Sequence, residues 1–387
     1  MNAKSLLISC SNRSEYGLLR PLIRKLSHSE ALPNIASHTL LLFSDAINSC
    51  QSDVRRDYSS GSARIEILEP SSRRESETVG EHFARLVNLF TGGYLSKYDG
   101  VLIAGDRYEN FALATRCFFE QIPIIHFFGG DISYGGHFDD HLRHAISHLA
   151  SVHFPVNSTA TNNLLEMHEE PSRIFHLGSP VVDEIAEVSR GNSKKYTWNI
   201  ILSFNPMTLG PPDAVSASLG ATLAAIDELS RTMPIQCLAT RPNNEPGSRE
   251  INRLIDAYNG RGWLEIADSL GSPAYLHAIK SASVVVGNSS SQLLEVPILG
   301  THSLLIGDRQ KGRHSPVTVS ALPGAPTKEE IQEKIRFLLD SPRPTPCIDY
   351  GKEGVTDAIL SVINRLMRLA RTALVSKSTP LPVEIGQ

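Results

Sequence analysis

Acidic residues with a spacing suited to proton transfer stand in two segments of the first half of the sequence. Asp106 is the central residue of GDR, and the adjacent pair Asp139 and Asp140 comes shortly before Arg143 and His144. Where carboxyl groups share a site, one with a raised pKa can donate a proton while another stays ionised, which suits general acid–base catalysis. A second interpretation is that the paired acids only complement the dipole of a helix that begins there.

A run of serines follows an apolar segment in the second half, in VVVGNSSSQLLE. The three valines are typical of a buried parallel strand, which Gly287 and the following asparagine end. Ser289, Ser290 and Ser291 then fall at the start of a helix predicted to begin near Gln292, where free N–H groups and the helix dipole form an anion site. The segment therefore predicts a phosphate site; the alternative is that the serines only cap the helix.

Three cations lie close together in the segment GDRQKGR, about twenty residues after the serines. They are Arg309, Lys311 and Arg313. Such a cluster is often only a solvated charged surface. Its position directly after a predicted strand, close in sequence to a candidate phosphate site, favours anion binding instead.

The elements that must position these residues alternate between short apolar runs and longer amphipathic ones. This alternation is typical of doubly wound parallel sheets, in which ligands bind beyond the carboxyl ends of the strands. We therefore expect the polar loops after the strands to form the site. The predicted strands are 5–10, 38–43, 100–104, 123–127 and 152–155, then 199–203, 235–239, 264–266, 283–286 and 303–306; the predicted helices include 17–27, 81–95 and 109–120.

A polar, glycine-containing break at residues 190–193 separates two similar halves. We predict an N-terminal Rossmann-like domain over residues 1–180 and a C-terminal one over residues 181–375. A helical pattern at 356–374 follows the last strand and is expected to pack back across the domain junction. The polar, proline-containing residues 376–387 are expected to form a mobile tail.

Composition argues against several classes of protein. The 387 residues are 41% hydrophobic and 20% charged, as in globular domains, and a formal net charge of −4 gives no reason to expect a nucleic-acid partner. No uncharged apolar run is long enough to cross a bilayer, and MNAKSLLISCSNRSEYG lacks the apolar stretch and cleavage site of a signal peptide. The sequence alone therefore predicts a cytoplasmic protein without a membrane partner.

Metal chemistry has weaker support. The cysteines are scattered and form no CxxC pair, which argues against a disulfide framework and a zinc knuckle. Histidines beside the paired aspartates, some with i, i+4 spacing, offer a rival interpretation in which a metal ion activates water. Because no HExxH or comparable signature is present, we predict no metal. The cysteines are Cys10, Cys50, Cys117, Cys237 and Cys347; the histidines are His137, His141, His144 and His148.

Several motifs occur in an order that resembles the hydrolysing UDP-N-acetylglucosamine 2-epimerases. They are GDRYE, HFFGGD, FDDHLRHAISHL, HLGSPVVDEI, SLGSPAYL, VVVGNSSSQLLEVP and IGDRQKGR. The resemblance runs from about Leu6 to about Leu366 and points to the branch that makes N-acetylmannosamine or its 2,4-diacetamido relatives for bacterial sialic-acid-like sugars. It implies an α/β fold of glycosyltransferase-B type, with two Rossmann-like domains facing a cleft. It also implies a UDP-sugar substrate, no cofactor, and a homodimer or homotetramer.

The resemblance assigns residues to the nucleotide sugar. It places the diphosphate on Ser289 and Ser290, and the ribose hydroxyls on Glu295, whose carboxylate can accept two hydrogen bonds from a cis-diol. The other residues expected to bind the substrate are Arg13, Arg107, His144, Asn205, Asn243, Arg249, Ser269, Leu270, Gly287, Ser291, Arg309, Lys311 and Arg313.

The reaction implied by the resemblance has two stages. UDP is eliminated with loss of the C2 proton, giving a glycal; water then adds at C1 while C2 is reprotonated on the opposite face, so that the released sugar is the C2 epimer. This chemistry needs proton-transfer groups on both faces of the ring and stabilisation of the leaving diphosphate. The expected catalytic residues are Asp106, Asp131, Asp139 and Asp140, of which Asp131 stands where the family's GGE motif has glutamate.

Two positions depart from the family pattern. Phe128 replaces a glutamate or histidine, and Asn205 replaces the histidine of a His-Pro pair; neither side chain transfers a proton at neutral pH. The interpretations are epimerisation by the aspartates alone, action on a modified UDP-sugar read by Phe128, plain hydrolysis or glycosyl transfer, and binding without catalysis. We expect a hydrolysing epimerase, because the carboxylates and the leaving-group site are intact.

Overall fold

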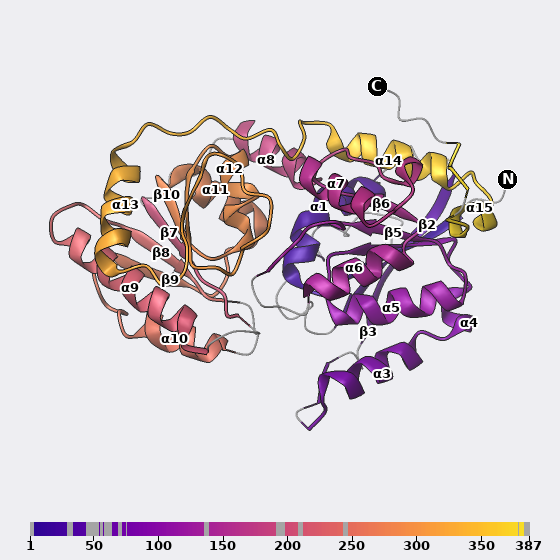
Figure 1. The fold of residues 1–387 in the computed structure, drawn as a ribbon, viewed down its shortest axis with the longest axis horizontal. Helices are drawn as coiled ribbons and strands as arrows, with labels where there is room; N and C mark the ends of the chain where they lie inside the picture. Colours follow the sequence, from indigo (N-terminus) through magenta and orange to yellow (C-terminus); the bar gives the residue numbers. More distant parts are fainter. Residues whose placement is uncertain are drawn as a thin grey trace. The chain divides into compact units, whose positions relative to one another are not determined.

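The chain divides into two units, each built on a parallel sheet (Figure 1). The first unit contains residues 1–131, 139–183 and 351–387, and the second contains residues 132–138 and 184–350. The structure is a computed structural model. It describes residues 4–28, 34–43, 54, 57, 64–68, 72–74, 76–134, 139–190, 198–207, 212–242, 247–377 and 379–382.

The sheet of the first unit contains β1 (Lys4–Cys10), β2 (Ile35–Phe43), β3 (Arg64–Leu68), β4 (Gly100–Ala104), β5 (Ile124–Phe127) and β6 (Val152–Phe154). Hydrogen bonds join these strands, all parallel, in the order β3-β2-β1-β4-β5-β6. Every residue of β4 is buried, as expected for an apolar strand covered on both faces. The strand order reverses between β1 and β4, and a ligand of a doubly wound sheet binds at such a point.

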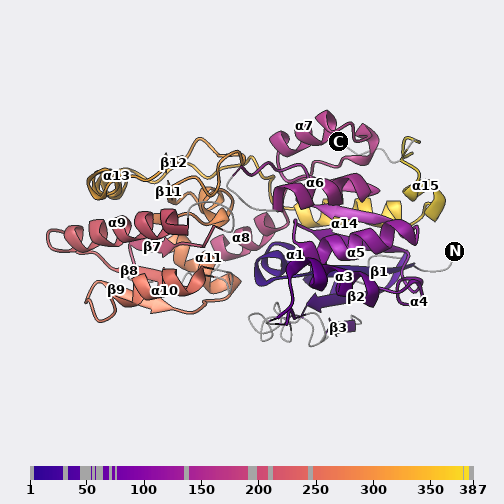
Figure 2. The ribbon, with the colours of Figure 1, turned by 60° about the horizontal axis from the view of Figure 1, so that its bottom comes forward.

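Helices enclose the core of the first unit. Apolar side chains of α3, α5 and α6 cluster with Leu7, Val101 and Ile103 from one face of the sheet. The last helices of the chain return to this unit: α14 packs against α1, and Figures 1 and 2 show yellow α14 and α15 among the indigo and magenta elements. The helices are α1 (Arg13–His28), α3 (Val79–Leu89), α4 (Gly92–Leu95), α5 (Tyr108–Phe119), α6 (Asp139–Leu149), α7 (Ser158–Glu166), the 3-10 helix η2 (Pro171–Arg173), α14 (Val355–Leu366) and α15 (Arg371–Val375).

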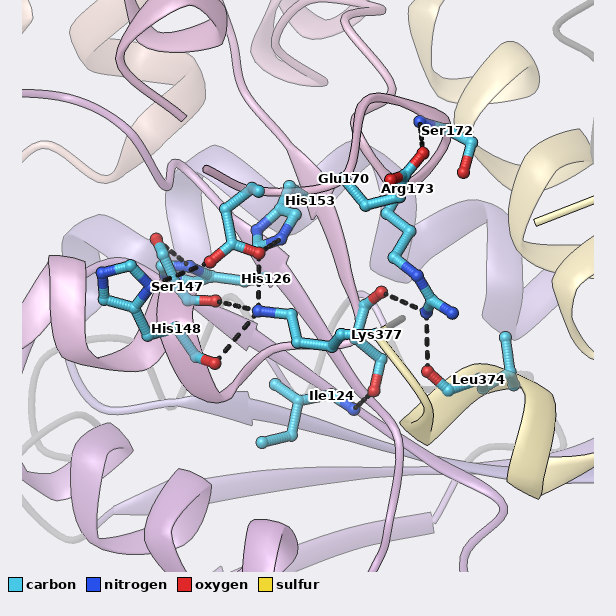
Figure 3. A network of polar contacts seen from close by, with 12 residues as sticks. Ile124, His126, Ser147, His148, His153, Glu170, Ser172, Arg173, Leu374 and Lys377 are labelled. Atoms are coloured by element: carbon cyan, nitrogen blue, oxygen red, sulfur yellow. Dashed lines mark hydrogen bonds and ion pairs between the residues drawn. The ribbon is translucent and has the colours of Figure 1, made fainter. Parts of the chain in front are cut away.

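The C-terminal segment is held in the first unit by Arg173, which is fully buried. Its guanidinium donates a hydrogen bond to the carbonyl oxygen of Leu374 at 2.7 Å (Figure 3), and another to the carbonyl oxygen of Thr379 at 2.9 Å. Lys377 donates a hydrogen bond to the backbone carbonyl oxygen of His148, near the end of α6, at 3.0 Å. The described residues of 376–387 therefore make specific contacts, whereas the sequence predicts a mobile tail.

Replacing Arg173 by methionine is expected to lower the free energy of unfolding by about 2 kcal/mol, because buried carbonyl oxygens lose their charged donor. Denaturation in urea measures this change. Arg253→Met is the matched control: the Arg253 side chain is 67% exposed and is paired with Glu250 in its own helix turn, so the unfolding midpoint of this variant is expected to stay at the wild-type value. Equal midpoint shifts in the two variants would contradict the anchoring role of Arg173.

The sheet of the second unit contains β7 (Ile200–Ser203), β8 (Cys237–Thr240), β9 (Leu264–Ala267), β10 (Val284–Gly287), β11 (His302–Ile306) and β12 (Val319–Leu322). The strands are parallel, in the order β12-β11-β10-β7-β8-β9, so the order reverses between β7 and β10. The helices are α8 (Val181–Arg190), in which the boundary between the units lies, α9 (Pro212–Ser230), α10 (Ser248–Asp256), α11 (Ser272–Ser281), the 3-10 helix η3 (Ser290–Gln292), α12 (Glu295–Ile298) and α13 (Lys328–Asp340).

Each strand predicted from the sequence overlaps an observed one, but β3 and β12 are missing from the prediction. Two predicted helices are wrong as single elements. The helix predicted at 81–95 is split into α3 and α4, because Thr91 caps a new helix by accepting a hydrogen bond from the N–H of Tyr94. The helix predicted at 356–374 is split into α14 and α15. Within the described part of the chain, no helix has the length and apolarity to cross a membrane.

Candidate active site

Asp106 lies just beyond the carboxyl end of β4, where the strand order of the first unit reverses. Its carboxylate accepts a hydrogen bond from the guanidinium of Arg143 in α6, whose side chain is 2% exposed. Arg143 also donates to Oδ1 of Asp140 at 3.1 Å and to the backbone carbonyl oxygen of Asp131 at 2.8 Å. One buried cation thus joins three of the four predicted catalytic aspartates.

The charge of Arg143 is sustained by the acids around it. Burial disfavours the charged form, but the carboxylates of Asp106, Asp131 and Asp140 outweigh this effect, so the pKa of Arg143 is raised. Asp139 and Asp140 form the first turn of α6 rather than preceding it, and both are half-buried. Asp140 therefore complements the helix dipole and also belongs to the cluster, which combines the two interpretations drawn from the sequence.

His144 lies beside the same acids, with its Nε2 at 3.5 Å from Oδ2 of Asp140. Burial lowers the pKa of His144, although Asp140 acts in the opposite direction. The ring is therefore neutral at neutral pH and able both to donate and to accept a hydrogen bond. Its Nδ1 is buried and has no hydrogen-bond partner among the described residues.

Glu15 of α1 lies near the Asp106 loop and is 6% exposed. Its carboxyl oxygens accept hydrogen bonds from the N–H of Ser11 at 2.6 Å and from Nδ2 of Asn110 at 3.1 Å. Burial raises the pKa of Glu15 to about 8, against the hydrogen bonds from Ser11, and the neighbouring Asp106 raises it further. Glu15 is thus largely protonated at neutral pH.

The raised pKa of Glu15 predicts a pH dependence of stability. With a pKa of 4.5 in the unfolded chain and about 8 in the folded one, the folded state holds an extra proton between these values, so this contribution to stability falls as pH rises. The expected slope is about 1.4 kcal/mol per pH unit. Glutamine does not ionise, so Glu15→Gln is expected to remove the contribution of Glu15 to the slope and to be more stable than the wild type at about pH 8.

Urea denaturation across this pH range measures the slope in both proteins. Glu329→Gln, at an exposed position of α13, is the control and is expected to retain the wild-type slope. Parallel stability profiles for the wild type and Glu15→Gln would show that the prediction is wrong.

Two arginines of the first unit follow β1 and β4, the strands at the switch point. Arg107 stands at the N-cap position of α5 without a capping side-chain bond, and it is paired with Glu109, with 2.9 Å between Nη2 and Oε1. Arg13 is the first residue of α1 and is half-buried. The side chain of Asn12 accepts a hydrogen bond from the N–H of Glu15 at 2.8 Å, so this residue caps the helix.

Phe128 follows β5 and is half-buried. Its φ of +63° is in the left-handed region, which bulky side chains rarely adopt, and its N–H donates to the carbonyl oxygen of Phe154 at 3.2 Å. Backbone strain of this kind is concentrated at functional sites. Phe128 therefore has an unusual backbone conformation, and its side chain is an apolar ring at a position where the family pattern has glutamate or histidine.

In the second unit, Asn288 joins the loops that follow β7 and β10, and its side chain is buried. Its Oδ1 accepts from the N–H of Asn205 at 2.7 Å, and its Nδ2 donates to the carbonyl oxygen of Asn205 at 2.9 Å. The backbone carbonyl oxygen of Asn288 accepts from Nε2 of Gln310 at 3.0 Å. The segments GNSSS and GDRQKGR and the Asn205 loop therefore converge at one edge of the sheet.

The three serines differ in their surroundings. Ser289 caps η3, Ser290 is exposed, and Ser291 is buried with its Oγ at 2.9 Å from the hydroxyl of Tyr275. The prediction of a helix beginning near Gln292 is wrong, because η3 is a three-residue 3-10 turn followed by the four-residue α12. The described residues after β10 therefore offer no long helix dipole, and the predicted phosphate site is left with loop N–H groups and the hydroxyl of exposed Ser290.

Glu295 is the first residue of α12 and is half-buried. Burial raises its pKa to about 7, and the nearby Glu184 adds to this effect. A carboxyl group that is partly protonated at neutral pH can both donate and accept hydrogen bonds.

The three cations of GDRQKGR have different surroundings. Arg309 donates from Nε to the carbonyl oxygen of Pro206 at 3.0 Å, which braces the loop after β7. Lys311 is exposed, and its carbonyl oxygen accepts from the N–H of Tyr134 at 2.7 Å. Arg313 is half-buried. Arg309 is therefore the cation with a demonstrated connection to the Asn205 loop.

The remaining predicted residues of the second unit lie in or after other strands. Gly287 is the last residue of β10 and is buried. Arg249 is exposed in the first turn of α10, and Ser269 and Leu270 follow β9, at the same carboxyl edge of the sheet. Asn243 lies outside the described residues.

Comparison with known proteins settles the family. A family model described as UDP-N-acetylglucosamine 2-epimerase matches residues 62–364 of the chain. The chain belongs to this family.

Relatives and a solved structure agree with the epimerase family. The chain is 27% identical over 326 residues to GDP/UDP-N,N'-diacetylbacillosamine 2-epimerase (hydrolyzing) of Campylobacter jejuni, with 81% of this chain and 83% of that protein covered. It is 24% identical over 360 residues to UDP-N,N'-diacetylbacillosamine 2-epimerase (hydrolyzing) of Legionella pneumophila, with 90% and 92% covered. The crystal structure of UDP-GlcNAc 2-epimerase from Neisseria meningitidis bound to UDP-GlcNAc is 16% identical, with a TM-score of 0.76 over 93% of this chain and 100% of that one. The predicted glycosyltransferase-B type of fold is confirmed.

Three residues at the centre of the clusters described above are missing from the site residues predicted from the sequence. Arg143 was detectable, because its i, i+3 spacing from Asp140 places both on one face of a helix. Glu15 stands in the first turn of α1, directly after the polar loop that follows the first strand, and this position was the available signal. Asn288 belongs to the recognised GNSSS segment, but its side-chain bonds to another loop depend on tertiary structure.

The histidines of the metal interpretation are distributed differently from a metal site. Among the described residues, no group of three or more His, Cys, Asp or Glu side chains is placed to hold a metal ion. His148 bonds from Nδ1 to Oε1 of Glu169 at 3.0 Å. His137 lies outside the described residues.

Proposed function

We propose that the chain is a hydrolysing 2-epimerase of a UDP-N-acetylhexosamine that releases UDP and the free manno-configured sugar. The observation that carries this proposal is the joining of Asp106, Asp131 and Asp140 by the buried Arg143 in a member of the UDP-N-acetylglucosamine 2-epimerase family. The carboxyl groups of Asp106 and Asp140, fixed in this way at a sheet switch point, are suited to proton transfer.

In the first stage, a carboxylate of this cluster removes the proton at C2 of the sugar. The electron pair of the C2–H bond forms the C1–C2 double bond of a glycal, and the C1–O bond breaks, so that UDP leaves with its electron pair. The departing diphosphate needs hydrogen-bond donors. In the second unit, loop N–H groups and the exposed hydroxyl of Ser290 are the donors that we assign to it.

In the second stage, a proton is delivered to C2 from the opposite face while the oxygen of water bonds to C1, and the water gives up its proton to a carboxylate of the cluster. The sum is UDP-sugar plus water giving UDP and the free C2 epimer, with no redox change and no cofactor. Because Phe128 and Asn205 cannot carry the protons, the aspartates must serve both stages, with the neutral His144 beside Asp140 as a further donor and acceptor.

The substrate class follows from the relatives. One of them is named for UDP-N,N'-diacetylbacillosamine and another for GDP/UDP-N,N'-diacetylbacillosamine, a 2,4-diacetamido-6-deoxy sugar, and this supports a UDP-acetamido sugar as the substrate of this chain. Phe128, half-buried at the end of β5, offers an apolar ring suited to a deoxygenated part of such a sugar. The free product would then serve the synthesis of sialic-acid-like sugars.

The test is NMR spectroscopy of the wild-type protein with UDP-N-acetylglucosamine, and with its 2,4-diacetamido-6-deoxy analogue, in deuterated water. Release of UDP together with manno-configured sugar that carries deuterium at C2 is expected. Gluco-configured sugar that keeps its C2 proton would instead mean plain hydrolysis, the second candidate, which is favoured by the absence of a proton carrier at Phe128 and Asn205. UDP binding without turnover would overturn both and leave a binding protein.

A further inference from the structure

His126 is a fully buried histidine of β5 whose two ring nitrogens both have partners. Nε2 lies 2.9 Å from the carbonyl oxygen of Gly105, and Nδ1 lies 3.1 Å from Oγ of Ser147. Figure 3 shows the His126 ring beside Ser147. Gly105 directly precedes Asp106, so the ring is connected to the backbone from which the central candidate acid projects.

The protonation state of the His126 ring follows from these partners. A carbonyl oxygen only accepts hydrogen bonds, so Nε2 carries the hydrogen and donates to Gly105. Burial lowers the pKa of His126 to about 3, so the ring is neutral at neutral pH. Nδ1 then has no hydrogen and accepts from the hydroxyl of Ser147, which fixes the tautomer that holds Gly105.

Helix α6 holds the turn at Gly105 and Asp106 at two points. Arg143 bonds the carboxylate of Asp106 directly. Ser147, four residues later and on the same face of the helix, bonds His126, which bonds the carbonyl oxygen of Gly105. The side chain and the backbone of the turn are therefore both held by one rigid element, α6.

The surrounding residues leave room for this bridge, the pair of hydrogen bonds that runs from Ser147 through His126 to Gly105. A Cβ at Gly129 would lie 2.8 Å from Nδ1 of His126 and 2.8 Å from Oγ of Ser147, closer than real Cβ atoms approach. A side chain there would push the two partners apart. The preceding carbonyl oxygen, of Ala104, accepts from Nδ2 of Asn110 at 2.8 Å, so consecutive peptide groups at the end of β4 are held by buried polar side chains.

We propose that His126, with its tautomer fixed by Ser147, is a positioning residue that sets the orientation of the Asp106 carboxylate for proton transfer at the sugar. This inference rests on the proposed function, because it concerns the same site. The bond to Gly105 fixes the peptide plane that precedes Asp106, and its loss lets that plane rotate. A misplacement of about 1 Å in a catalytic group costs roughly 10²-fold in rate.

Three variants test the proposal. His126→Phe removes both bonds, His126→Gln keeps a donor near the place of Nε2, and Ser147→Ala removes the hydroxyl that fixes the tautomer. His126→Phe is expected to lower kcat roughly 10- to 100-fold with KM within about twofold, His126→Gln to recover most of the loss, and Ser147→Ala to fall between them.

A matched control separates the bridge from general effects of a buried histidine. His153 is also fully buried, lies opposite His126 on the adjacent strand β6, and bonds Oε2 of Glu169 at 3.0 Å. His153→Phe is expected to leave kcat at the wild-type value. A loss of kcat equal to that of His126→Phe would overturn the proposal.

A double variant distinguishes positioning from a structural role. In the background of Asp106→Asn, His126→Phe is expected to cause no further loss of kcat, because it acts through the carboxylate that is already missing. The proposal would be overturned if His126→Phe and His126→Gln lowered kcat equally. It would also be overturned if the loss of kcat in His126→Phe multiplied with the loss in Asp106→Asn.

NMR spectroscopy supplies a readout that needs no turnover. In the wild type, Nε2 of His126 is expected to be protonated and Nδ1 bare between about pH 5 and about pH 8. The Cγ resonance of Asp106 is expected to shift in His126→Phe but not in His153→Phe. If the wild type releases no epimerised sugar, the proposed function fails. A protonated Nδ1 of His126 in the wild type, or an unchanged Asp106 resonance in His126→Phe, would overturn the positioning role itself.

Discussion

Asp106→Asn is expected to lower kcat for release of the epimerised sugar roughly 10²- to 10⁴-fold, the usual range for loss of a general acid or base. The amide keeps the size of the side chain but cannot take up a proton from C2. Arg143 retains its bonds to Asp140 and to the carbonyl oxygen of Asp131, so the fold of the first unit is expected to persist. UDP release and deuterium at C2 measure turnover, and titration calorimetry with UDP measures binding, which is expected to stay at the wild-type value.

Asp99→Asn is the control for this substitution. Asp99 stands just before the other end of β4 and forms a partly exposed ion pair with Lys4, with 3.0 Å between Nζ and Oδ1. Its replacement changes the same functional group in the same strand region and is expected to leave kcat unchanged. A loss below about tenfold in Asp106→Asn, with UDP binding intact, would remove Asp106 from the catalytic groups.

The fold was largely predictable from the sequence where apolar runs are continuous. Gly100–Ala104 was predicted with its observed bounds, because every residue of this strand is buried on a sheet covered on both faces. β3 alternates Arg64 and Glu66 with apolar residues, and Ser320 interrupts the apolar residues of β12, so neither produced a clear apolar run. Local pattern thus identifies strands with continuous apolar runs better than strands with interrupted ones.

The interrupted helix after GNSSS had a detectable sequence signal. Pro297 has no N–H, so it cannot bond the carbonyl oxygen of Leu293, as a continuous α-helix through this segment would require. Tertiary contacts also oppose a regular helix. The side chain of Gln292 donates to the carbonyl oxygens of Val285 at 3.1 Å and Leu304 at 2.9 Å, in the strands below. The proline could have been read from the sequence, but the anchoring of Gln292 could not.

The candidate site was predictable as a set of loops but not as a set of bonds. Because parallel strands end at the same edge of a sheet, Asp106 and Ser290 could be assigned to loops from the strand pattern alone. The pairing of Asp106 with Arg143 and the joining of Asn205 to Asn288 involve residues 37 and 83 positions apart. Contacts at such separations follow from packing, which a single sequence does not encode in any local spacing.

Gly287→Ala is expected to lower the free energy of unfolding of the second unit by about 3 to 5 kcal/mol, the sum of backbone strain and overpacking. Gly287 has a φ of +146°, and a Cβ there would lie 2.0 Å from the carbonyl oxygen of Ser203 on the paired strand β7. That oxygen also accepts from the N–H of Asn288 at 3.1 Å. Separating the strands would therefore displace Asn288 and the GNSSS loop, so UDP affinity is expected to fall tenfold or more, that is, by about 1.4 kcal/mol or more.

Gly260→Ala isolates the steric part of this effect. Gly260 also has a positive φ, +84°, but no atom lies within 4 Å of the place where its Cβ would be. Its replacement is expected to cost about 1 kcal/mol in backbone strain alone and to leave UDP binding unchanged. Urea denaturation and titration calorimetry compare the two variants. Similar stability and similar UDP affinity in both would mean that the close approach of β10 to β7 at Gly287 does not hold the GNSSS loop in place.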